Sequence, residues 1–294
     1  MTTSEHQTLW VRAMPLLFVF LWSTGFIGVK FGMPYVLPMT FLALRFAFVV
    51  ALMLPIALAS GAPWPSSQQQ FAHIAFSGVL VHAGYLSGVF LAIYFGMSAG
   101  LIALIAGMQP ILTAFVAAPF LGERVSAREW VGLLLGLGGV ALVVMEKITL
   151  AGLSSSAVAS AILALLSITI GTVYQKRYCG AFDLRTGSVI QFVSAALVVV
   201  PLAIAAESLR VDWTGEFIFA LAWLVVVLSI GAISLLNLLI RRGAATRLAS
   251  LFYLVPPTTA VLAYFLFGET LSAAALAGMA FAIAGVALVV TASR

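Results

Sequence analysis

Long apolar runs alternate with short polar breaks along the whole chain. A helix that crosses a bilayer needs about 20 mostly apolar residues, and each run is close to that length. The pattern predicts ten transmembrane helices, at residues 12–32, 38–60, 71–96, 100–121, 127–146, 153–176, 184–206, 216–240, 245–267 and 271–291. The breaks carry turn residues and are too short for a soluble domain. We therefore expect an all-α membrane protein.

The composition excludes a soluble globular protein. Of the 294 residues, 63% are hydrophobic and 8% are charged, and the mean hydropathy is +1.18. These charges are too few to cover a surface in water, so the lipid bilayer is the expected surroundings. The net charge of +5 is scattered over short loops, which gives no reason to expect a nucleic-acid partner. The first run, Met14 to Gly32, has full membrane length and is interpreted as a helix rather than a signal peptide.

The basic residues predict the orientation of the chain. If the N-terminus is cytoplasmic, the opposite side holds only Lys30, Lys147 and Arg210. The cytoplasmic side then holds Arg12, Arg124, Arg128, Lys176, Arg177, Arg185, Arg241, Arg242, Arg247 and Arg294. By the positive-inside rule, both termini are expected in the cytoplasm of a bacterium, with the protein in its inner membrane.

The two halves of the sequence repeat with a constant offset of 146 residues. The offset aligns Gly25 with Gly171, Lys30 with Lys176, Pro110 with Pro256, and Gly122-Glu123 with Gly268-Glu269, and it repeats GVALVV at 139–144 and 285–290. Any two apolar helices share some residues, but one register across several helices favours duplication.

The repeat predicts the domain organisation. We expect five-helix repeats at 1–147 and 148–294 that form a single membrane unit, a monomer built as an internal pseudo-dimer. An odd number of helices per half makes the second repeat inverted relative to the first. Inverted repeats are typical of transporters that expose one central site alternately to each side.

Two proline sites at matching positions predict paired hinges. Gln109-Pro110 lies in the fourth predicted helix and Pro256-Pro257 in the ninth. Proline removes a backbone donor and frees a carbonyl one turn earlier, so a kink near the membrane centre is expected in each helix. A single proline is common in membrane helices, but the matched pair favours a functional role.

Polar and aromatic residues inside apolar helices are the candidates for a substrate site. The candidates are Trp22, Ser23, His82, Tyr85, Gln109, Thr172, Ser234, Asn237 and Tyr253. For serine and threonine, the alternative is close helix packing with a hydrogen bond to the preceding turn. His82 and Tyr85 lie three residues apart on one helical face, and a histidine that only bonds a neighbour is an equal alternative to a ligand contact.

Arg45 is the charge farthest inside a predicted helix, where a cation costs about 2.5–3.5 kcal/mol on insertion scales. It is a candidate for binding a substrate carboxylate or for an outer gate, and extension to the lipid headgroups is the alternative. No Asp or Glu lies in mid-helix, and Glu123 and Glu269 at helix ends are expected to cap the helix that follows. The sequence shows no hydrolytic or metal-binding motif, so no catalytic residue, metal or cofactor is expected.

Several short motifs resemble one known family. They are LWSTGFIGVKFG at 21–32, LALRF at 42–46, LGE at 121–123 and FGE at 267–269. The chain is similar over nearly its whole length to the drug/metabolite transporter superfamily, specifically the EamA-type ten-helix exporters. The resemblance implies a basket in which helices 1–4 and 6–9 surround a central cavity while helices 5 and 10 lie outside. Small four-helix relatives carry a proton-coupling Glu in helix 1, but Trp22 to Gly28 holds no acid here, so that mechanism is not carried over.

The expected function is export of a small-molecule substrate by alternating access. Members of the family export amino acids, and the aromatic cavity candidates favour aromatic or large apolar amino acids or related metabolites. Two alternatives remain open: export of other small metabolites or drugs, and, more remotely, an intramembrane lipid-modifying enzyme or a scaffold.

Overall fold

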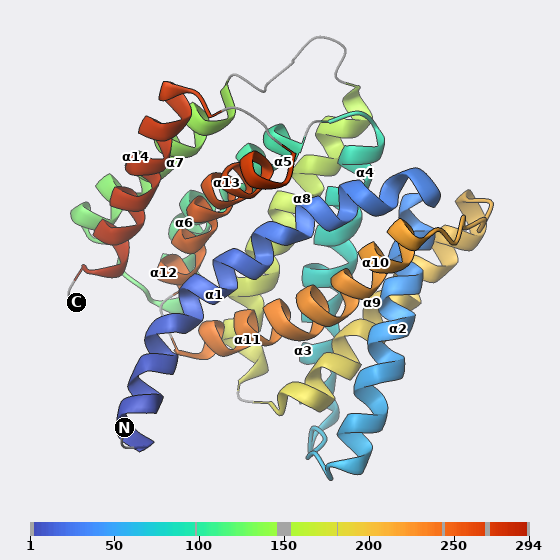
Figure 1. Cartoon of the computed structure of the whole chain (residues 1–294). Helices are drawn as coiled ribbons and strands as arrows, with labels where there is room; N and C mark the ends of the chain where they lie inside the picture. Colours follow the sequence, from blue (N-terminus) through green and yellow to red (C-terminus); the bar gives the residue numbers. More distant parts are fainter. Residues whose placement is uncertain are drawn as a thin grey trace.

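The computed structural model describes residues 3–97, 99–145, 154–180, 182–242, 245–267 and 271–292, so Lys147, Gly268, Glu269 and Arg294 lie outside the described residues. The described part is helical apart from one isolated bridge between Val36 and Val211. Its α-helices are α1 Thr3–Gly32, α2 Pro38–Ala59, α3 Gln68–Gly78, α4 Tyr85–Tyr94, α5 Ala99–Ala106, α6 Gln109–Leu121, α7 Ala127–Met145, α8 Ser155–Tyr174, α9 Leu184–Ala206, α10 Gly215–Trp223, α11 Ile233–Arg242, α12 Ala245–Ser250, α13 Val255–Phe267 and α14 Ala273–Val290 (Figure 1).

Shorter turns join some of these helices end to end. They are the 3₁₀ turns η1 Met33–Tyr35 and η5 Leu251–Leu254, and the π-helical segments η2 Val79–Gly84, η3 Gln175–Cys179 and η4 Leu224–Ala232. The expected all-helical membrane protein is confirmed. Among the described residues, seven runs are long and apolar enough to cross a membrane: Ala13–Tyr35, Pro38–Ala59, Gln68–Tyr94, Ser155–Cys179, Leu184–Ala206, Gly215–Arg242 and Ala273–Val290.

The helices predicted at 100–121 and 245–267 are broken rather than kinked, which corrects the expectation of continuous helices. In the first, α5 ends at Ala106 and α6 starts at Gln109, with Pro110 in its first turn. In the second, α12 is followed by the 3₁₀ turn η5, and Pro256 lies in the first turn of α13. Proline is tolerated there because the first N–H groups of a helix have no intrahelical partner. The prolines therefore begin new helices.

Two π-helical segments interrupt the longest spans, which the sequence did not predict. The segment η2 joins α3 to α4, and η4 joins α10 to α11. An offset of 146 residues moves Val79–Gly84 to positions 225–230, which lie within Leu224–Ala232. The hydroxyl of Ser229 donates to the Leu224 carbonyl, 3.0 Å away and five residues earlier, as the wider π turn allows. Such segments change which side chains face the interior and are frequent at functional sites.

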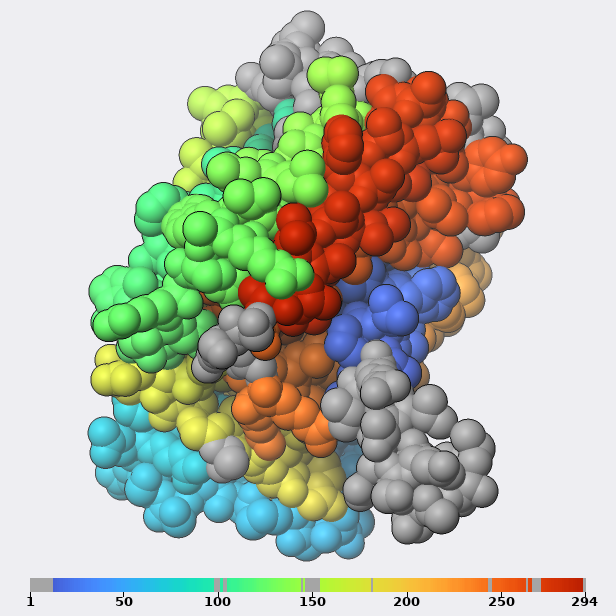
Figure 2. All heavy atoms as spheres, turned by 90° about the vertical axis from the view of Figure 1, so that its left-hand side faces the viewer, coloured from blue at the N-terminus to red at the C-terminus, as the bar shows by residue number. Residues whose placement is uncertain are grey.

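Helices α7 and α14 cross in an antiparallel pair through glycines. A Cβ atom on Gly132 would lie 2.7 Å from the Gly285 carbonyl oxygen, and one on Gly139 would lie 2.6 Å from the Gly278 carbonyl oxygen. No side chain fits between backbones this close, so small residues set the approach of the two helices. Figure 2 shows them side by side on one face, α7 in green and α14 in red. This pair covers the outside of the bundle.

Helices α2 and α9 form a second antiparallel pair. At one end, the Glu207 carboxylate accepts hydrogen bonds from the N–H groups of Met39 and Thr40, at 2.8 and 2.7 Å. At the other end, the hydroxyl of Thr186 donates to the Pro63 carbonyl at 2.8 Å. Residues after each helix thus contact the first turn of the other, where N–H groups lack intrahelical partners. These contacts fix the register of the two helices.

Candidate functional site

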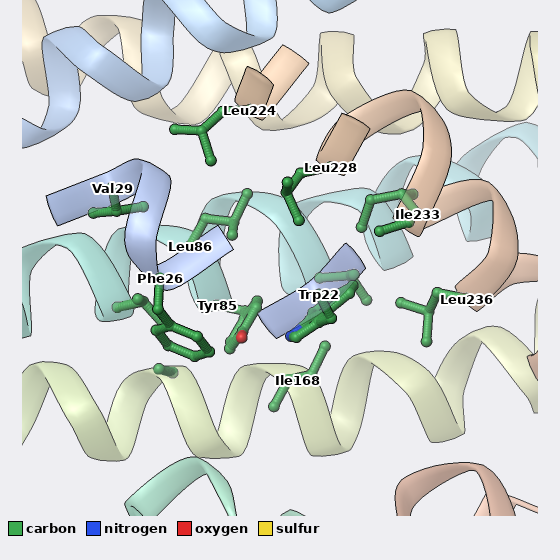
Figure 3. Packing of buried hydrophobic residues seen from close by; sticks show 14 of the residues in the cluster. Trp22, Phe26, Val29, Tyr85, Leu86, Ile168, Leu224, Leu228, Ile233 and Leu236 are labelled. Carbon is green, nitrogen blue, oxygen red and sulfur yellow. The ribbon is translucent and has the colours of Figure 1, made fainter. Parts of the chain in front are cut away.

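A cavity lies between α1, α2, α4, η4 and α11. The space between its walls is about 420 Å³, and this figure includes open solvent at the mouth of the cavity. Its lining consists of Trp22, Gly25, Phe26, Val29, Arg45, Tyr85, Leu86, Val89, Phe90, Leu228 and Ile233. Figure 3 shows how the aromatic and aliphatic members of this wall lie between the helices. The wall is apolar except for one guanidinium and a few aromatic polar groups.

One side of the cavity is an aromatic cluster centred on Trp22. The Trp22 ring stacks on Tyr85 with centroids 6.0 Å apart and planes at 22°, and Phe252 meets Trp22 edge-on at 5.3 Å. Gly107, between α5 and α6, and Pro256, at the start of α13, border the same aromatic residues in an adjoining small pocket. The breaks in the two helices therefore lie beside Trp22 and Tyr85, so the proline sites and the aromatic candidates predicted from the sequence are neighbours in the structure.

Arg45 is the charged group of this cavity. Its side chain is 3% exposed, so it does not extend to the protein surface, and the alternative of reaching the headgroups is excluded. Its Nε donates to the Ser229 hydroxyl at 2.9 Å, and Ser229 is its only hydrogen-bond partner in the described part of the chain. No described carboxylate lies within ion-pair distance of Arg45. A buried cation without a counter-ion is costly and is typical of a binding or transport site.

His82 lies behind this wall rather than in it. Its ring is fully buried and stacks on Phe192, with centroids 4.2 Å apart and planes at 13°. Both ring nitrogens lack a hydrogen bond of regular geometry, although the Gln191 amide lies beside them. His82 is not among the residues that line the cavity. The structure thus supports a packing role for it, and η2 explains why: the π turn breaks the three-residue spacing that placed His82 beside Tyr85.

Ser23 and Ser234 do not line the cavity either. The Ser23 hydroxyl donates to the carbonyls of Val19, at 2.7 Å, and Val255, at 3.3 Å, so it joins α1 to the start of α13. Ser234 is half-buried and lies outside the cavity lining. For these residues the packing alternative describes the geometry better than substrate contact.

Tyr253 is replaced in the aromatic cluster by its neighbour Phe252. The Tyr253 ring is fully buried against α7, where a Cβ atom on Gly136 would lie 2.4 Å from its Cδ2 atom. The 3₁₀ turn η5 spans both aromatic residues and has three residues per turn, so Phe252 rather than Tyr253 contacts Trp22, and neither residue lines the cavity at Arg45. The sequence contains both residues but no signal for this turn.

A buried chain of amides occupies the other end of the bundle. The Gln175 side chain donates to Asn237 Oδ1 at 2.8 Å, and the Gln191 side chain donates to Gln175 Oε1 and to the Ser77 hydroxyl, both at 3.0 Å. The chain connects η3, α11, α9 and α3. Asn237 therefore contacts this network rather than the cavity. The offset of 146 residues places Gln191 at the position equivalent to Arg45, and this equivalence is the only sequence feature that indicated a polar site here.

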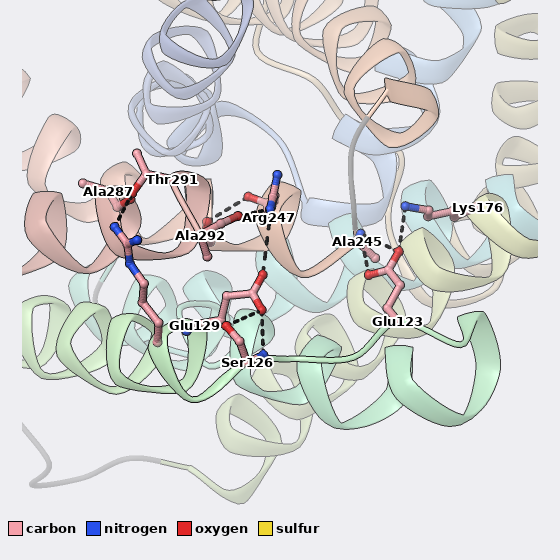
Figure 4. Close-up of polar contacts among 11 residues, drawn as sticks. Glu123, Ser126, Glu129, Lys176, Ala245, Arg247, Ala287, Thr291 and Ala292 are labelled. Carbon is pink, nitrogen blue, oxygen red and sulfur yellow. Dashed lines mark hydrogen bonds and ion pairs between the residues drawn. The ribbon is translucent and has the colours of Figure 1, made fainter. Parts of the chain in front are cut away.

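Glu123 holds a helix of the other half of the chain. Its carboxylate forms an ion pair with Lys176 at 2.8 Å and accepts hydrogen bonds from the N–H of Ala245, at 3.0 and 3.1 Å (Figure 4). Ala245 begins α12, so the expectation that Glu123 caps the next helix, α7, is wrong. Glu129 instead accepts from the N–H of Ser126 at 2.7 Å, where α7 begins. The long-range contact was not visible in the sequence.

Asp183 is a structural carboxylate in the loop before α9. It accepts hydrogen bonds from the Arg185 N–H, at 2.9 Å, and from the Arg185 side chain, at 3.0 and 2.7 Å. These bonds hold the pKa of Asp183 down to about 2. Because it stays ionised at any physiological pH, Asp183 is a helix cap and does not carry protons.

Apolar helices that cross the membrane around a cavity with a buried guanidinium are typical of a membrane transporter for small solutes. The sequence model of the EamA-like transporter family matches residues 9–145 and again residues 155–291. The chain belongs to the EamA-like transporter family, within the superfamily that its motifs resemble. It is a transporter and not an enzyme.

Curated relatives agree with this family, and one solved structure shares the fold. The chain is 25% identical over 291 residues to a probable amino-acid metabolite efflux pump of Salmonella typhimurium, covering 92% of each chain. It is 24% identical to a protein of the same description from Escherichia coli, again covering 92% of each. An uncharacterized inner membrane transporter of Escherichia coli, YedA, is 25% identical over 86% of this chain and 81% of its own. A crystal structure of a protein with 19% identity has a TM-score of 0.76 over 94% of this chain and 95% of its own, so the two share a fold.

Proposed function

We propose that this transporter exports amino acids or related metabolites, preferentially those with aromatic or large apolar side chains. The observation that carries the proposal is Arg45, a buried guanidinium with no described counter-ion, in a cavity whose other walls are aromatic and aliphatic. The relatives described as probable amino-acid metabolite efflux pumps support it. An amino acid presents the complementary chemistry: a carboxylate for the cation and a side chain for the apolar wall.

Substrate binding then divides into two contacts. The guanidinium of Arg45 donates two charge-assisted hydrogen bonds to the substrate carboxylate in a bidentate arrangement. The side chain packs against Trp22 and Tyr85, where aromatic pairs add about 0.5–1.5 kcal/mol beyond the burial of apolar area. Large apolar substrates are favoured because they fill more of the space between these walls.

Alternating access of ten helices in two inverted repeats is the proposed mechanism. The two family matches begin at residues 9 and 155, 146 residues apart. The same offset moves Gly132 to Gly278 and Gly139 to Gly285. In the crossing of α7 and α14, Gly132 contacts Gly285 and Gly139 contacts Gly278. This exchange of equivalent positions is what a two-fold axis between the halves requires. These features support a monomer of two related halves. Such symmetry gives two equivalent openings of one site. From the basic residues we infer that both termini lie in the cytoplasm and that the protein lies in a bacterial inner membrane.

The test is direct transport by the purified protein. Proteoliposomes are loaded with labelled phenylalanine, leucine, glycine, a purine, a sugar or a cationic dye, and protein-dependent efflux is measured. We expect efflux of phenylalanine and leucine above that of glycine. Efflux of the purine or the dye without any amino acid would contradict the proposal and favour export of another metabolite or drug.

The change Tyr85→Ala tests the aromatic wall. We expect it to weaken transport of phenylalanine about 2- to 10-fold while changing transport of alanine little, because only the larger side chain reaches the ring. The measurement is the substrate concentration for half-maximal flux in proteoliposomes, with Tyr85→Phe as the control that keeps the ring. An equal loss for both amino acids would show that Tyr85 only packs.

A further inference from the structure

A second, smaller chamber with three polar residues in its lining lies at the Lys176 end of the bundle. Its walls are Gln109, Thr172, Lys176, Ile240, Ala245, Leu248 and Ala249, none of which lines the cavity at Arg45. The space between them is about 230 Å³, open solvent included. The enclosed part has room for about one water-sized group, so a larger ligand needs the space now taken by the Glu123 carboxylate beside Lys176.

The chamber presents the cation Lys176 and one buried acceptor, Gln109 Oε1, that has no hydrogen-bond partner among the described residues. Gln109 is 1% exposed, and its Oε1 has no hydrogen-bond partner in the described part of the chain. Lys176 lines the same walls. The Thr172 hydroxyl already donates to the Ile168 carbonyl at 2.8 Å, so its oxygen is left as a second acceptor. A buried acceptor without a donor is unfavourable, so a ligand that brings N–H groups is favoured.

The Lys176 ammonium forms an ion pair with a carboxylate that also caps a helix. Glu123 binds Lys176 at 2.8 Å while it accepts the N–H of Ala245, the first residue of α12. The side chains of Lys176 and Glu123 are 23% and 11% exposed, so this pair is partly shielded from water. A carboxylate that takes the place of Glu123 on Lys176 would also release Glu123 from α12. Occupancy of the chamber and the attachment of α12 are thus linked through one side chain.

The same three residue types recur at the positions related to them by the offset between the two halves. The offset of 146 residues relates Lys176, Ala245 and Glu123 to Lys30, Ala99 and Glu269. Glu269 lies outside the described residues, so the recurrence is a property of the sequence. It indicates that the trio is an element of the fold and not an isolated surface contact.

We propose that this chamber is a second binding site, for the head group of an α-amino acid, in which the cargo carboxylate replaces that of Glu123 on Lys176. The cargo ammonium then donates to Gln109 and Thr172, and the release of Glu123 frees the start of α12. The inference rests on the proposed function. It adds an entry site on the side that the basic residues predict to be cytoplasmic, where an exporter takes up its cargo.

Opposite effects of two substitutions test the competition. We expect Lys176→Met to raise the phenylalanine concentration for half-maximal flux from the Lys176 side about tenfold, because a charge-assisted bond is lost. Glu123→Gln should lower that concentration, because the competing carboxylate is gone while an amide oxygen still accepts from Ala245. Arg241→Gln is the matched control, since Arg241 lies at the same end but contacts Phe182 and is not part of this chamber. If both variants raise the phenylalanine concentration for half-maximal flux, the proposal is overturned and the Lys176–Glu123 ion pair is only structural.

A labelling experiment tests the site without relying on flux. The chain has one cysteine, so Cys179→Ser with Ala249→Cys places a single thiol in the chamber wall, and Leu248→Cys provides a second reporter. We expect phenylalanine to slow reaction with a maleimide, phenylalaninamide not to, and Lys176→Met to abolish the protection. Flux of phenylalanine without protection of either reporter would overturn the chamber and leave the proposed function standing. Protection without flux of any amino acid would support the chamber and contradict the proposed function.

Discussion

Replacing Arg45 with methionine is expected to weaken transport of carboxylate substrates about 10- to 100-fold, judged by the concentration for half-maximal flux. Hydrogen bonds to charged groups contribute about 1.5–3 kcal/mol, and each 1.4 kcal/mol is about a tenfold change in affinity. Arg45 has Ser229 as its only described partner, so its other donors are available to a substrate. Methionine keeps the unbranched shape and removes the charge, which isolates the electrostatic contribution.

Two controls separate binding from folding. Phenylalaninamide carries an ammonium but no carboxylate, so in the unchanged protein it meets the like charge of Arg45. Its affinity, measured by competition with phenylalanine, should therefore be higher in Arg45→Met. The monodispersity and the unfolding temperature of the variant in detergent should stay close to those of the unchanged protein, because burying methionine in an apolar wall is favourable. An equal loss for phenylalanine and its amide would show that Arg45 acts through structure alone.

Replacing Gly139 with valine is expected to destabilise the protein by about 1–3 kcal/mol or more, the usual effect of overpacking. A Cβ atom at this position would lie 2.5 Å from the Ala282 nitrogen and 2.6 Å from the Gly278 oxygen. Both are backbone atoms of α14, so no side-chain rotation relieves the clash and the two helices must separate. The measurement is the thermal unfolding temperature in detergent.

The neighbouring Gly138 is the matched control for this prediction. It lies in the same helix, is exposed, and a Cβ atom there would have nothing within 4 Å. Gly138→Val should therefore leave the unfolding temperature nearly unchanged or raise it slightly, since glycine is a poor helix former. If both valine variants unfold at the same temperature, the close crossing of α7 and α14 does not contribute to stability.

The sequence predicted the membrane class, and its motifs pointed to the family, because both are properties of short stretches of chain. Apolar runs of membrane length need no knowledge of neighbours, and the offset of 146 residues is read directly from the letters. Trp22, Arg45 and Tyr85, candidates for substrate contact because aromatic or charged groups stand out in apolar helices, do line the cavity, and their contact with substrate stays a prediction. Tyr253 was the other aromatic candidate in this region, but its neighbour Phe252 contacts Trp22 instead, because the local turn is 3₁₀ and not α-helical.

The geometry of the site came from contacts between helices that are distant in sequence. Arg45 meets Ser229 across 184 positions, and Glu123 meets Ala245 across 122. The segments η2, η4 and η5 shift the phase of the side chains that follow them, so an α-helical periodicity assigns His82 and Tyr253 to the wrong wall.

The sequence by itself therefore determined that this is a helical membrane protein with an internal repeat and the motifs of a transporter family. Only the tertiary structure decided which polar groups face the cavity, which are used in packing, and that Lys176 lines a separate chamber. The physical reason is that hydropathy is a property of each segment, whereas the lining of a cavity depends on the helical phase and close packing of several segments together.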